Sequence, residues 1–501
     1  MKMIFRAIIL SLTVASLLMA MNVEYRDDAS DDHGPVVMTR TQDKLYIDVN
    51  GSRYLLDKDN GSFKPDYEME NETEIVGIKT QFHGILGAFE IEGYSFMVFV
   101  EIKRKVGMFL QHPVWLVEKV HFEPIQNVPN QLLTQFIDPM LKKVSSILTD
   151  RFYYCNSFNL ATSIQRKASN ERSQYLLTNR NMRLKSSELG IRTDHVLYSI
   201  RGYFGWKRTE MRNGIVLNMA VVSRMSPDRI GTRYNVRGAD LMGNVLFVES
   251  EMVMWTDNLD IIASYTQIRG SIPLIWRETN TGIIINSNQR HHEKSVSLHF
   301  DRLLDMYKGK VVCVNLLEAE GREAELSRAY ERHLVRISHS KLVNFEYNKV
   351  LRSADDWEGR FLKIIGFDLL KDIGFTLVDG NSMNVKRQQR GVFRLNCLDC
   401  LDRTGKVLSL IFDANLLPML MAVTQASDSG FYGLMPGDVE SVRVNLHLML
   451  TEMSHALSRQ YTGSWALRKD TSYFSLLCDI YSSTNRYFNH LLWDMKKQMA
   501  I

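Results

Sequence analysis

Cysteine is scarce in this sequence, which contains five in 501 residues. Cys155, Cys313 and Cys478 stand alone, so the spacing of a disulfide framework is missing, and a reducing compartment is favoured. Only one Cys-x-x-Cys pair is present, Cys397 and Cys400, and a structural zinc site needs more ligands than one such pair supplies. We therefore expect no metal and no other cofactor.

An excess of charge of either sign is also missing. The 61 basic and 57 acidic side chains leave a net charge of +4, which gives no bulk attraction to nucleic acid. A local basic face for anionic lipid remains compatible with this balance. Internal repeats and low-complexity tracts are absent. With 501 residues, 45% of them hydrophobic, the chain can bury the cores of two or more globular domains.

The N-terminus carries an apolar run, residues 7–21, behind Lys2 and Arg6. The run has the length of a signal-peptide core and is short of the roughly 20 residues of a membrane span. A later translation start at Met19 or Met21 and an interfacial anchor are the alternatives. We interpret residues 1–30 as a hydrophobic leader or anchor with a linker, and rank weak membrane association first.

Strand-like patterns dominate the part that follows. Residues 45–49 and 52–56 flank Asn50-Gly51, which predicts a β-hairpin. Residues 132–148 carry an apolar face at helical spacing, interrupted at Pro139. The sequence thus predicts a β-rich N-terminal domain over residues 31–187.

The last part of that domain, residues 165–187, is basic and polar. It is interpreted as a linker or domain edge, either a solvated loop or a surface for anionic membrane. From residue 188 onward, strands such as 214–218 and 310–316 alternate with helices such as 322–335, which predicts a mixed α/β catalytic domain over residues 188–501. His291-His292 is assigned to a solvated polar loop.

The chemistry is predicted around Cys397, which is followed after five residues by Arg403 and Thr404. Apolar residues 391–393 before it indicate a strand end, and Val407 and Leu410 after it recur at helical spacing. A loop of this length between strand and helix can turn its N–H groups toward a phosphate, while the arginine holds two phosphate oxygens. The helix N-terminus and the arginine also favour a cysteine thiolate.

Other interpretations of the same residues stay open. A cysteine at a buried strand end is often only a small apolar residue, and Cys397-x-x-Cys400 could be a redox pair or half a metal site. Neither alternative explains the arginine and threonine at the right offset. The bare Cys-x5-Arg pattern is short enough to arise by chance, so by itself it is moderate evidence.

The wider stretch Arg394-x-Asn396-Cys397-x-Asp399-Cys400-x-Asp402-Arg403-Thr404 resembles the signature of the Sac-domain phosphoinositide phosphatases. Further segments agree in the expected order, among them Arg237-Gly238-x-Asp240 and Gln267-Ile268-Arg269-Gly270-Ser271-Ile272-Pro273. The likeness covers roughly residues 75–500. It implies an α/β fold, with a β-rich domain before the catalytic domain and the Cys-x5-Arg phosphate loop between strand and helix.

The resemblance implies roles for individual residues. Cys397 is the expected nucleophile, Arg403 the phosphate ligand, and Asp399 the first candidate for the general acid, with Asp402 second, because a carboxylate beside a phosphate favours its protonated form. Alternatively, these two carboxylates only cap the helix or orient Arg403. Thr404 is expected to bond the Cys397 sulfur. The phosphate-binding residues are predicted to be Leu398, Asp399, Cys400, Leu401, Asp402, Arg403 and Thr404.

Substrate and location also follow from the resemblance. It implies hydrolysis of phosphatidylinositol phosphates, with phosphatidylinositol 4-phosphate as the main substrate, at the cytosolic face of reticulum or Golgi membranes; it specifies no protein partner. The sequence departs from the family pattern at Gly405, where asparagine is usual, and beyond Asp470, where a basic run is expected. A phosphoinositide-binding protein without turnover is therefore the alternative function.

Overall fold

The computed structural model describes residues 35–466, except 43, 58–59, 67–76, 169–173, 232–235, 280–281, 354–355 and 426–433. The chain divides into two units, residues 1–32, which are not described, and a second, compact unit, His33–Ile501. The predicted leader or anchor, residues 1–30, lies outside the described residues, as do residues 467–501, the end of the predicted catalytic domain. All elements named below belong to the second unit.

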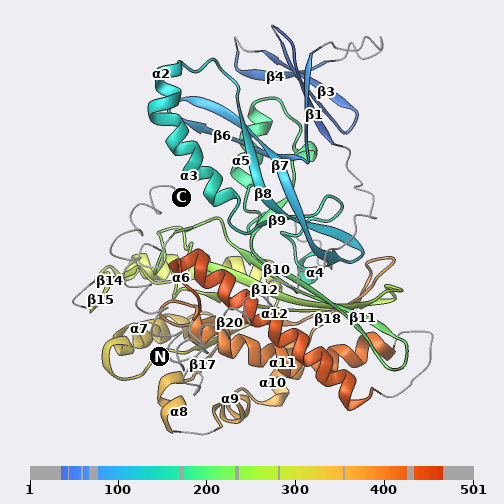
Figure 1. Cartoon of the computed structure of the whole chain (residues 1–501). Helices are drawn as coiled ribbons and strands as arrows, with labels where there is room; N and C mark the ends of the chain where they lie inside the picture. The colour runs from blue at the N-terminus through green and yellow to red at the C-terminus, as the bar shows by residue number, and fades with distance from the viewer. Residues whose placement is uncertain are drawn as a thin grey trace, which may run out of the picture. The chain divides into compact units, whose positions relative to one another are not determined.

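The first strands form a five-stranded antiparallel sheet in the order β4-β3-β2-β1-β5 (Figure 1). They are β1 (Val36–Arg40), β2 (Leu45–Val49), β3 (Ser52–Asp57), β4 (Ser62–Pro65) and β5 (Ile78–Phe82). The hairpin predicted at Asn50-Gly51 is confirmed. Both residues have positive φ, 49° and 74°, the left-handed region that a two-residue hairpin turn requires. Leu45, Ile47 and Val49 alternate into the core, as expected for a strand with one buried face.

The larger sheet of the described residues has 13 strands and runs in the order β17-β16-β20-β13-β12-β11-β10-β9-β8-β7-β6, with β18 on β13 and β19 on β18. The bounds are β6 (Ile85–Ile91), β7 (Tyr94–Phe109), β8 (His112–Pro124), β9 (Phe152–Tyr154), β10 (Ser199–Glu210), β11 (Val216–Met225), β12 (Phe247–Thr256), β13 (Ile261–Gly270), β16 (Lys310–Asn315), β17 (Ser340–Asn344), β18 (Thr376–Asp379), β19 (Val385–Arg387) and β20 (Gly391–Asn396). A separate hairpin consists of β14 (Trp276–Thr279) and β15 (Gly282–Ile285). The fold is therefore α/β with a β-rich N-terminal part, as predicted. The boundary between residues 187 and 188 stays a prediction.

Helices cover both faces of this sheet (Figure 1). The helical segments of the described residues are α2 (Asn130–Leu132), η2 (Leu133–Ile137), α3 (Asp138–Leu148), α4 (Ile164–Ala168), α5 (Arg180–Glu188), η3 (Thr193–His195), α6 (Gln289–Tyr307), η4 (Gly321–Glu323), α7 (Ala324–Leu334), α8 (Tyr347–Ser353), α9 (Trp357–Ile365), α10 (Phe367–Ile373), α11 (Asp402–Gln425) and α12 (Pro436–Thr462). β20 lies between the two helical layers: Val392 packs in a core with α6 and α7, while Phe393 and Leu395 pack in a core with α9 to α12. All six β20 residues are buried, as expected of a parallel strand covered on both faces.

Helix α11 has an apolar composition that is found both in membrane-spanning helices and in the core helices of globular proteins. Among the described helices, its residues Asp402–Thr424 alone are long and apolar enough to cross a membrane by length and composition. Of that apolar window, 56% is buried in the fold, where Val407, Leu408 and Ile411 pack against the sheet. The contacts are those of a core helix.

Two predictions about exposed segments are wrong. Arg166 and Arg183, assigned to a linker or domain edge, are buried in α4 and α5; Arg166 pairs with Glu249, and Arg183 donates to backbone carbonyls. His292, assigned to a solvated loop, is buried in α6, and its ring nitrogens bond Ile275 N and Asn286 O. Exposure was predicted from the polar composition of both segments, but polar side chains can be buried where they are hydrogen-bonded.

Candidate active site

The site begins where three parallel strands end together. β17, β16 and β20 are neighbours, and their last residues Asn344, Asn315 and Asn396 are paired in register. Asn396 donates to the Asn315 side chain at 2.7 Å, and Asn315 donates to the Asn344 side chain at 3.1 Å. Asn315 and Asn396 are buried and Asn344 is exposed, and this row of bonded amides fixes the position at which the chain leaves β20. It therefore positions the next residue, Cys397.

Cys397 opens a short loop that ends at α11, so the predicted placement between strand and helix is confirmed. Its side chain is 2% exposed, and its sulfur accepts the backbone N–H of Cys400 at 3.0 Å. Cys400 has a φ of 55°, a left-handed turn that returns the chain toward the sulfur. Burial opposes ionisation, but the hydrogen bonds from Cys400 and the charge of Arg403 outweigh it and lower the pKa of Cys397 to about 6. The site can hold a thiolate at neutral pH.

Cys400 behaves in the opposite way. Burial, together with the hydrogen bond and charge of Cys397, raises the pKa of the Cys400 thiol well above its ordinary value. Its sulfur lies 3.5 Å from the Cys397 carbonyl oxygen. Of the two cysteines in the loop, only Cys397 is prepared as a nucleophile.

Arg403 lies in the first turn of α11 and is held by a carboxylate. Its Nη1 donates to Glu323 at 2.8 Å and to the Leu316 carbonyl at 3.0 Å, and its Nη2 donates to Glu323 at 2.6 Å. Burial lowers the pKa of this guanidinium, but the bond to Glu323 and the charge of Cys397 raise it by more. Leu316 directly follows β16, which neighbours β20, so Arg403 is anchored on the β16 side of Cys397.

The two loop carboxylates have different surroundings. Asp399 pairs with the buried Arg237, whose Nε lies 3.0 Å from Asp399 Oδ1 and whose Nη1 also pairs with Glu278 of β14. Asp402 is the first residue of α11 and lines a neighbouring cavity. The structure therefore places Asp399 beside a cation and Asp402 at a surface that a ligand can reach.

The remaining predicted residues fall into two groups. Leu398 is partly exposed, whereas Leu401 and Thr404 are buried. The Thr404 hydroxyl donates to the Leu401 carbonyl at 3.3 Å, so its predicted bond to the Cys397 sulfur is not the bond found here. Thr404 closes the first turn of α11.

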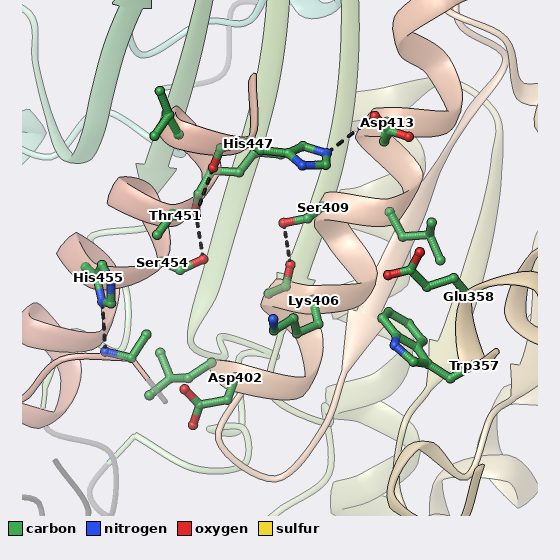
Figure 2. Close-up of a pocket in the computed structure, with 16 residues that line it drawn as sticks. Trp357, Glu358, Asp402, Lys406, Ser409, Asp413, His447, Thr451, Ser454 and His455 are labelled. Atoms are coloured by element: carbon green, nitrogen blue, oxygen red, sulfur yellow. Dashed lines mark hydrogen bonds and ion pairs between the residues drawn. The ribbon is translucent and has the colours of Figure 1, made fainter. Parts of the chain in front are cut away.

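A cavity of about 500 Å3 opens beside the loop, between α11 and α12. Side chains of the two helices face each other across it, with Asp413 paired to His447, and Trp357 and Glu358 line a third side (Figure 2). Leu401, Asp402 and Gly405 bring the first turn of α11 to its wall. The end of the loop is thus connected to solvent.

Sequence reasoning missed Glu323 and the asparagine row. Nothing in the sequence pairs Glu323 with Arg403, because the pairing depends on β16 lying next to β20, more than 70 residues apart in the sequence. One signal was available. Asn315 lies near the end of the predicted strand 310–316 and Asn396 follows the predicted strand end at 391–393, and the ends of parallel strands meet at one edge of a sheet.

Comparisons with known proteins agree with this geometry. A family model described as the SacI homology domain matches residues 83–372, more than half of the chain. Phosphatidylinositol-3-phosphatase SAC1-A of Danio rerio is 26% identical over 92% of this chain and 82% of its own length. Phosphoinositide phosphatase SAC8 of Arabidopsis thaliana is 25% identical over 89% of this chain and 79% of its own length. Synaptojanin-1 of Rattus norvegicus is 32% identical over 56% of this chain but only 17% of its own length. On the family match and the loop that its motifs predicted, this chain belongs to the SacI homology domain family, the Sac-domain phosphoinositide phosphatases.

Proposed function

We propose that this protein hydrolyses the phosphate monoester of phosphatidylinositol phosphates, with phosphatidylinositol 4-phosphate as its main substrate, through a phosphocysteine intermediate. The observation that carries the proposal is the buried Cys397 with its lowered pKa, placed between β20 and the N-terminus of α11. A chain that only bound phosphate would have no chemical use for a thiolate at this position. Relatives named as phosphoinositide phosphatases supply the substrate class.

In the proposed reaction, the Cys397 thiolate attacks phosphorus, a sulfur–phosphorus bond forms, and the bond from phosphorus to the inositol oxygen breaks. Asp399 gives its proton to that leaving oxygen. Water then attacks the phosphocysteine, Asp399 takes a proton from the water, and inorganic phosphate leaves with the thiolate restored. The loop N–H groups, residues 398–404, and Arg403 stabilise the charge that develops on the phosphate oxygens.

The pairing of Asp399 with Arg237 fits this role once phosphate is bound. In the structure, Arg237 balances the Asp399 charge. A phosphate dianion beside them attracts the same guanidinium and repels the carboxylate, and both effects favour a protonated Asp399. Asp402, which faces the cavity, is the second candidate for the acid.

The alternative is a phosphoinositide-binding protein without turnover, and one observation favours it. Arg403 is engaged by Glu323 and the Leu316 carbonyl instead of facing an open loop. These bonds use Nη1 and Nη2, and among the described residues no acceptor is bonded to Nε. An N–H group therefore remains for phosphate. Because binding alone does not require a thiolate, we favour turnover.

The first prediction tests turnover directly. Phosphate release from short-chain phosphatidylinositol 4-phosphate should be lost in Cys397→Ser and Arg403→Ala, because the first removes the nucleophile and the second removes the arginine proposed to bind the phosphate oxygens. Thermal unfolding of each variant shows whether it remains folded, since removing a buried group can also act through stability. Release that persists in a folded Cys397→Ser protein would contradict the mechanism. Lipid binding without release by the wild-type protein would favour the binding function.

We also propose that the protein acts at the cytosolic face of reticulum or Golgi membranes. The family resemblance supports this location, and the cysteines are compatible with it. The four cysteines of the described chain are all free, as in a reducing compartment.

A further inference from the structure

Arg269 is a buried cation, and the part of the chain that the structure describes offers no hydrogen-bond acceptor to two of its three guanidinium nitrogens. It lies near the end of β13, is paired in register with Leu395 of β20, and is 1% exposed. Among the described residues, no group accepts a hydrogen bond from its Nε or Nη2. Leaving a charged group unpaired in the interior is costly, so such a group calls for a specific explanation.

Two other deeply buried arginines show how unusual this is. Arg224 donates from all three guanidinium nitrogens, to Leu160 O, Glu249 and Glu251. Arg394, on β20, does the same to His299, Tyr330 and Ser271 O. All three guanidinium nitrogens of Arg224 and Arg394 thus have hydrogen-bond acceptors, as expected of structural residues, whereas two of those of Arg269 have none among the described residues.

The surroundings of Arg269 direct its charge toward the catalytic loop. It shares a small cavity with Cys400 and Leu401 of the loop and with Tyr461 of α12, and the other lining residues are apolar. A side chain at Gly405 would place its Cβ 3.7 Å from Arg269 Nη1, so the guanidinium lies directly behind the first turn of α11. Burial lowers the pKa of Arg269 to about 10, while Cys400, Cys397 and Asp402 act in the opposite direction. Arg269 remains a cation at neutral pH, and the titratable groups around it are these three together with Tyr461 of the shared cavity.

The order of strands places this cation opposite Arg403. Cys397 follows β20, which lies between β16 and β13. Arg403 is anchored at the end of β16, and Arg269 belongs to β13. The charges of Arg403 and Arg237 are already balanced by Glu323, and by Asp399 and Glu278. Arg269 is therefore the one of these three cations that forms no ion pair with a carboxylate of the described residues.

We propose that Arg269 is a positioning residue of the phosphate site, which stabilises the Cys397 thiolate and the phosphate monoester bound on the loop from the β13 side. The inference rests on the proposed function. The anions that Arg269 stabilises are those formed during the reaction: first the Cys397 thiolate, then the bound phosphate and the phosphocysteine. An uncompensated charge behind the loop lowers the energy of each of these anions without contact with the lipid.

The experiment compares Arg269→Met with Arg394→Met in the full-length protein. The readouts are the pH midpoint of iodoacetamide labelling at Cys397, located by mass spectrometry, the protection of that thiol by inorganic phosphate at pH 7, and the thermal unfolding midpoint. In Arg269→Met we expect the labelling midpoint to rise by about one pH unit or more and phosphate protection to weaken about tenfold. Arg269→Lys, which keeps the charge, should preserve most of both.

Stability separates a positioning role from a structural one. Arg269→Met removes an unpaired buried charge, so its unfolding midpoint should equal or exceed that of the wild type, whereas Arg394→Met leaves three bonded partners unpaired and should unfold at a lower temperature. A folded Arg269→Met protein with wild-type labelling and phosphate protection would overturn the proposal, and so would destabilisation matching that of Arg394→Met. If Arg269→Met does not fold, the same readouts in Arg269→Gln decide. No readout uses lipid or turnover, so failure of the proposed function is seen separately, as absent phosphate release by the wild type.

Discussion

At the scale of single residues, the two cysteines of the loop are prepared for different states. Both are buried and three positions apart, yet the Cys400 N–H donates to the Cys397 sulfur. This hydrogen bond and the charge of Arg403 both lower the pKa of Cys397. The same interaction penalises a second negative charge on Cys400. Ionisation is therefore concentrated on one sulfur. This is the electrostatic basis for assigning the nucleophile to Cys397.

The prediction at this scale is that the two thiols become reactive toward iodoacetamide at widely different pH values. Labelling of Cys397 by iodoacetamide should rise with pH through about 6 and level off above it, because the lowered pKa makes the thiolate the main form from there upward. Cys400 should stay unlabelled until the pH exceeds the ordinary thiol range. Mass spectrometry of the labelled peptide distinguishes the two sites. Equal labelling of both thiols at every pH would contradict the assignment.

At the scale of elements, the first turn of α11 contains Gly405, one of the positions at which this chain departs from the family pattern. The space around it is not tight. A Cβ there would lie 3.4 Å from Ser454 Oγ and 3.7 Å from Arg269 Nη1, which are ordinary contacts. The packing around position 405 therefore does not require glycine and leaves room for an alanine side chain. The cost of Gly405 is that of glycine in a helix, because glycine loses more backbone freedom on folding than alanine.

We therefore expect Gly405→Ala to raise the free energy of unfolding by about 0.5–1 kcal/mol, with phosphate release unchanged. Urea unfolding and the lipid assay measure the two quantities. Gly391→Ala at the start of β20 is the matched control: a Cβ there would overlap the carbonyl oxygen of Lys310, so this variant should be destabilised. Loss of stability in Gly405→Ala would mean that the turn needs glycine for a reason other than space.

Individual helices and strands were also the features that the sequence predicted best. The hairpin at residues 45–56, strand β16 and helix α7 follow from local alternation, turn chemistry and helical spacing, and the structure confirms them within a few residues. The position of the catalytic loop was predicted for the same reason, since its strand and helix are contiguous. The pairing of Glu323 with the loop was not predicted, because Glu323 reaches it only through the lateral order of β16 and β20. That order depends on long-range packing and leaves no local pattern.

At the scale of the whole molecule, the catalytic loop depends on elements far apart in the chain. The cores on the two faces of β20 contain residues from Tyr175 to Tyr461. The proposed nucleophile is a thiolate next to a second thiol, and such a pair is preserved where cellular thiols are kept reduced. Disulfide-forming compartments would oppose the proposed chemistry. This requirement of the proposed chemistry supports the proposed location at the cytosolic face of the membrane.

The last prediction concerns this location. The full-length protein with a C-terminal tag, expressed with sealed microsomes, should lose the tag to added protease without detergent, because the proposed location puts the catalytic domain on the cytosolic side. A lumenal marker protein that stays intact in the same sample shows that the vesicles are closed. If the apolar run at residues 7–21 instead directed the chain across the membrane, the positive residues before it would remain outside and the tag would be protected. Protection would place Cys397 in an oxidising lumen, away from lipids of the cytosolic leaflet, and would contradict the proposed location together with the substrate inferred from it.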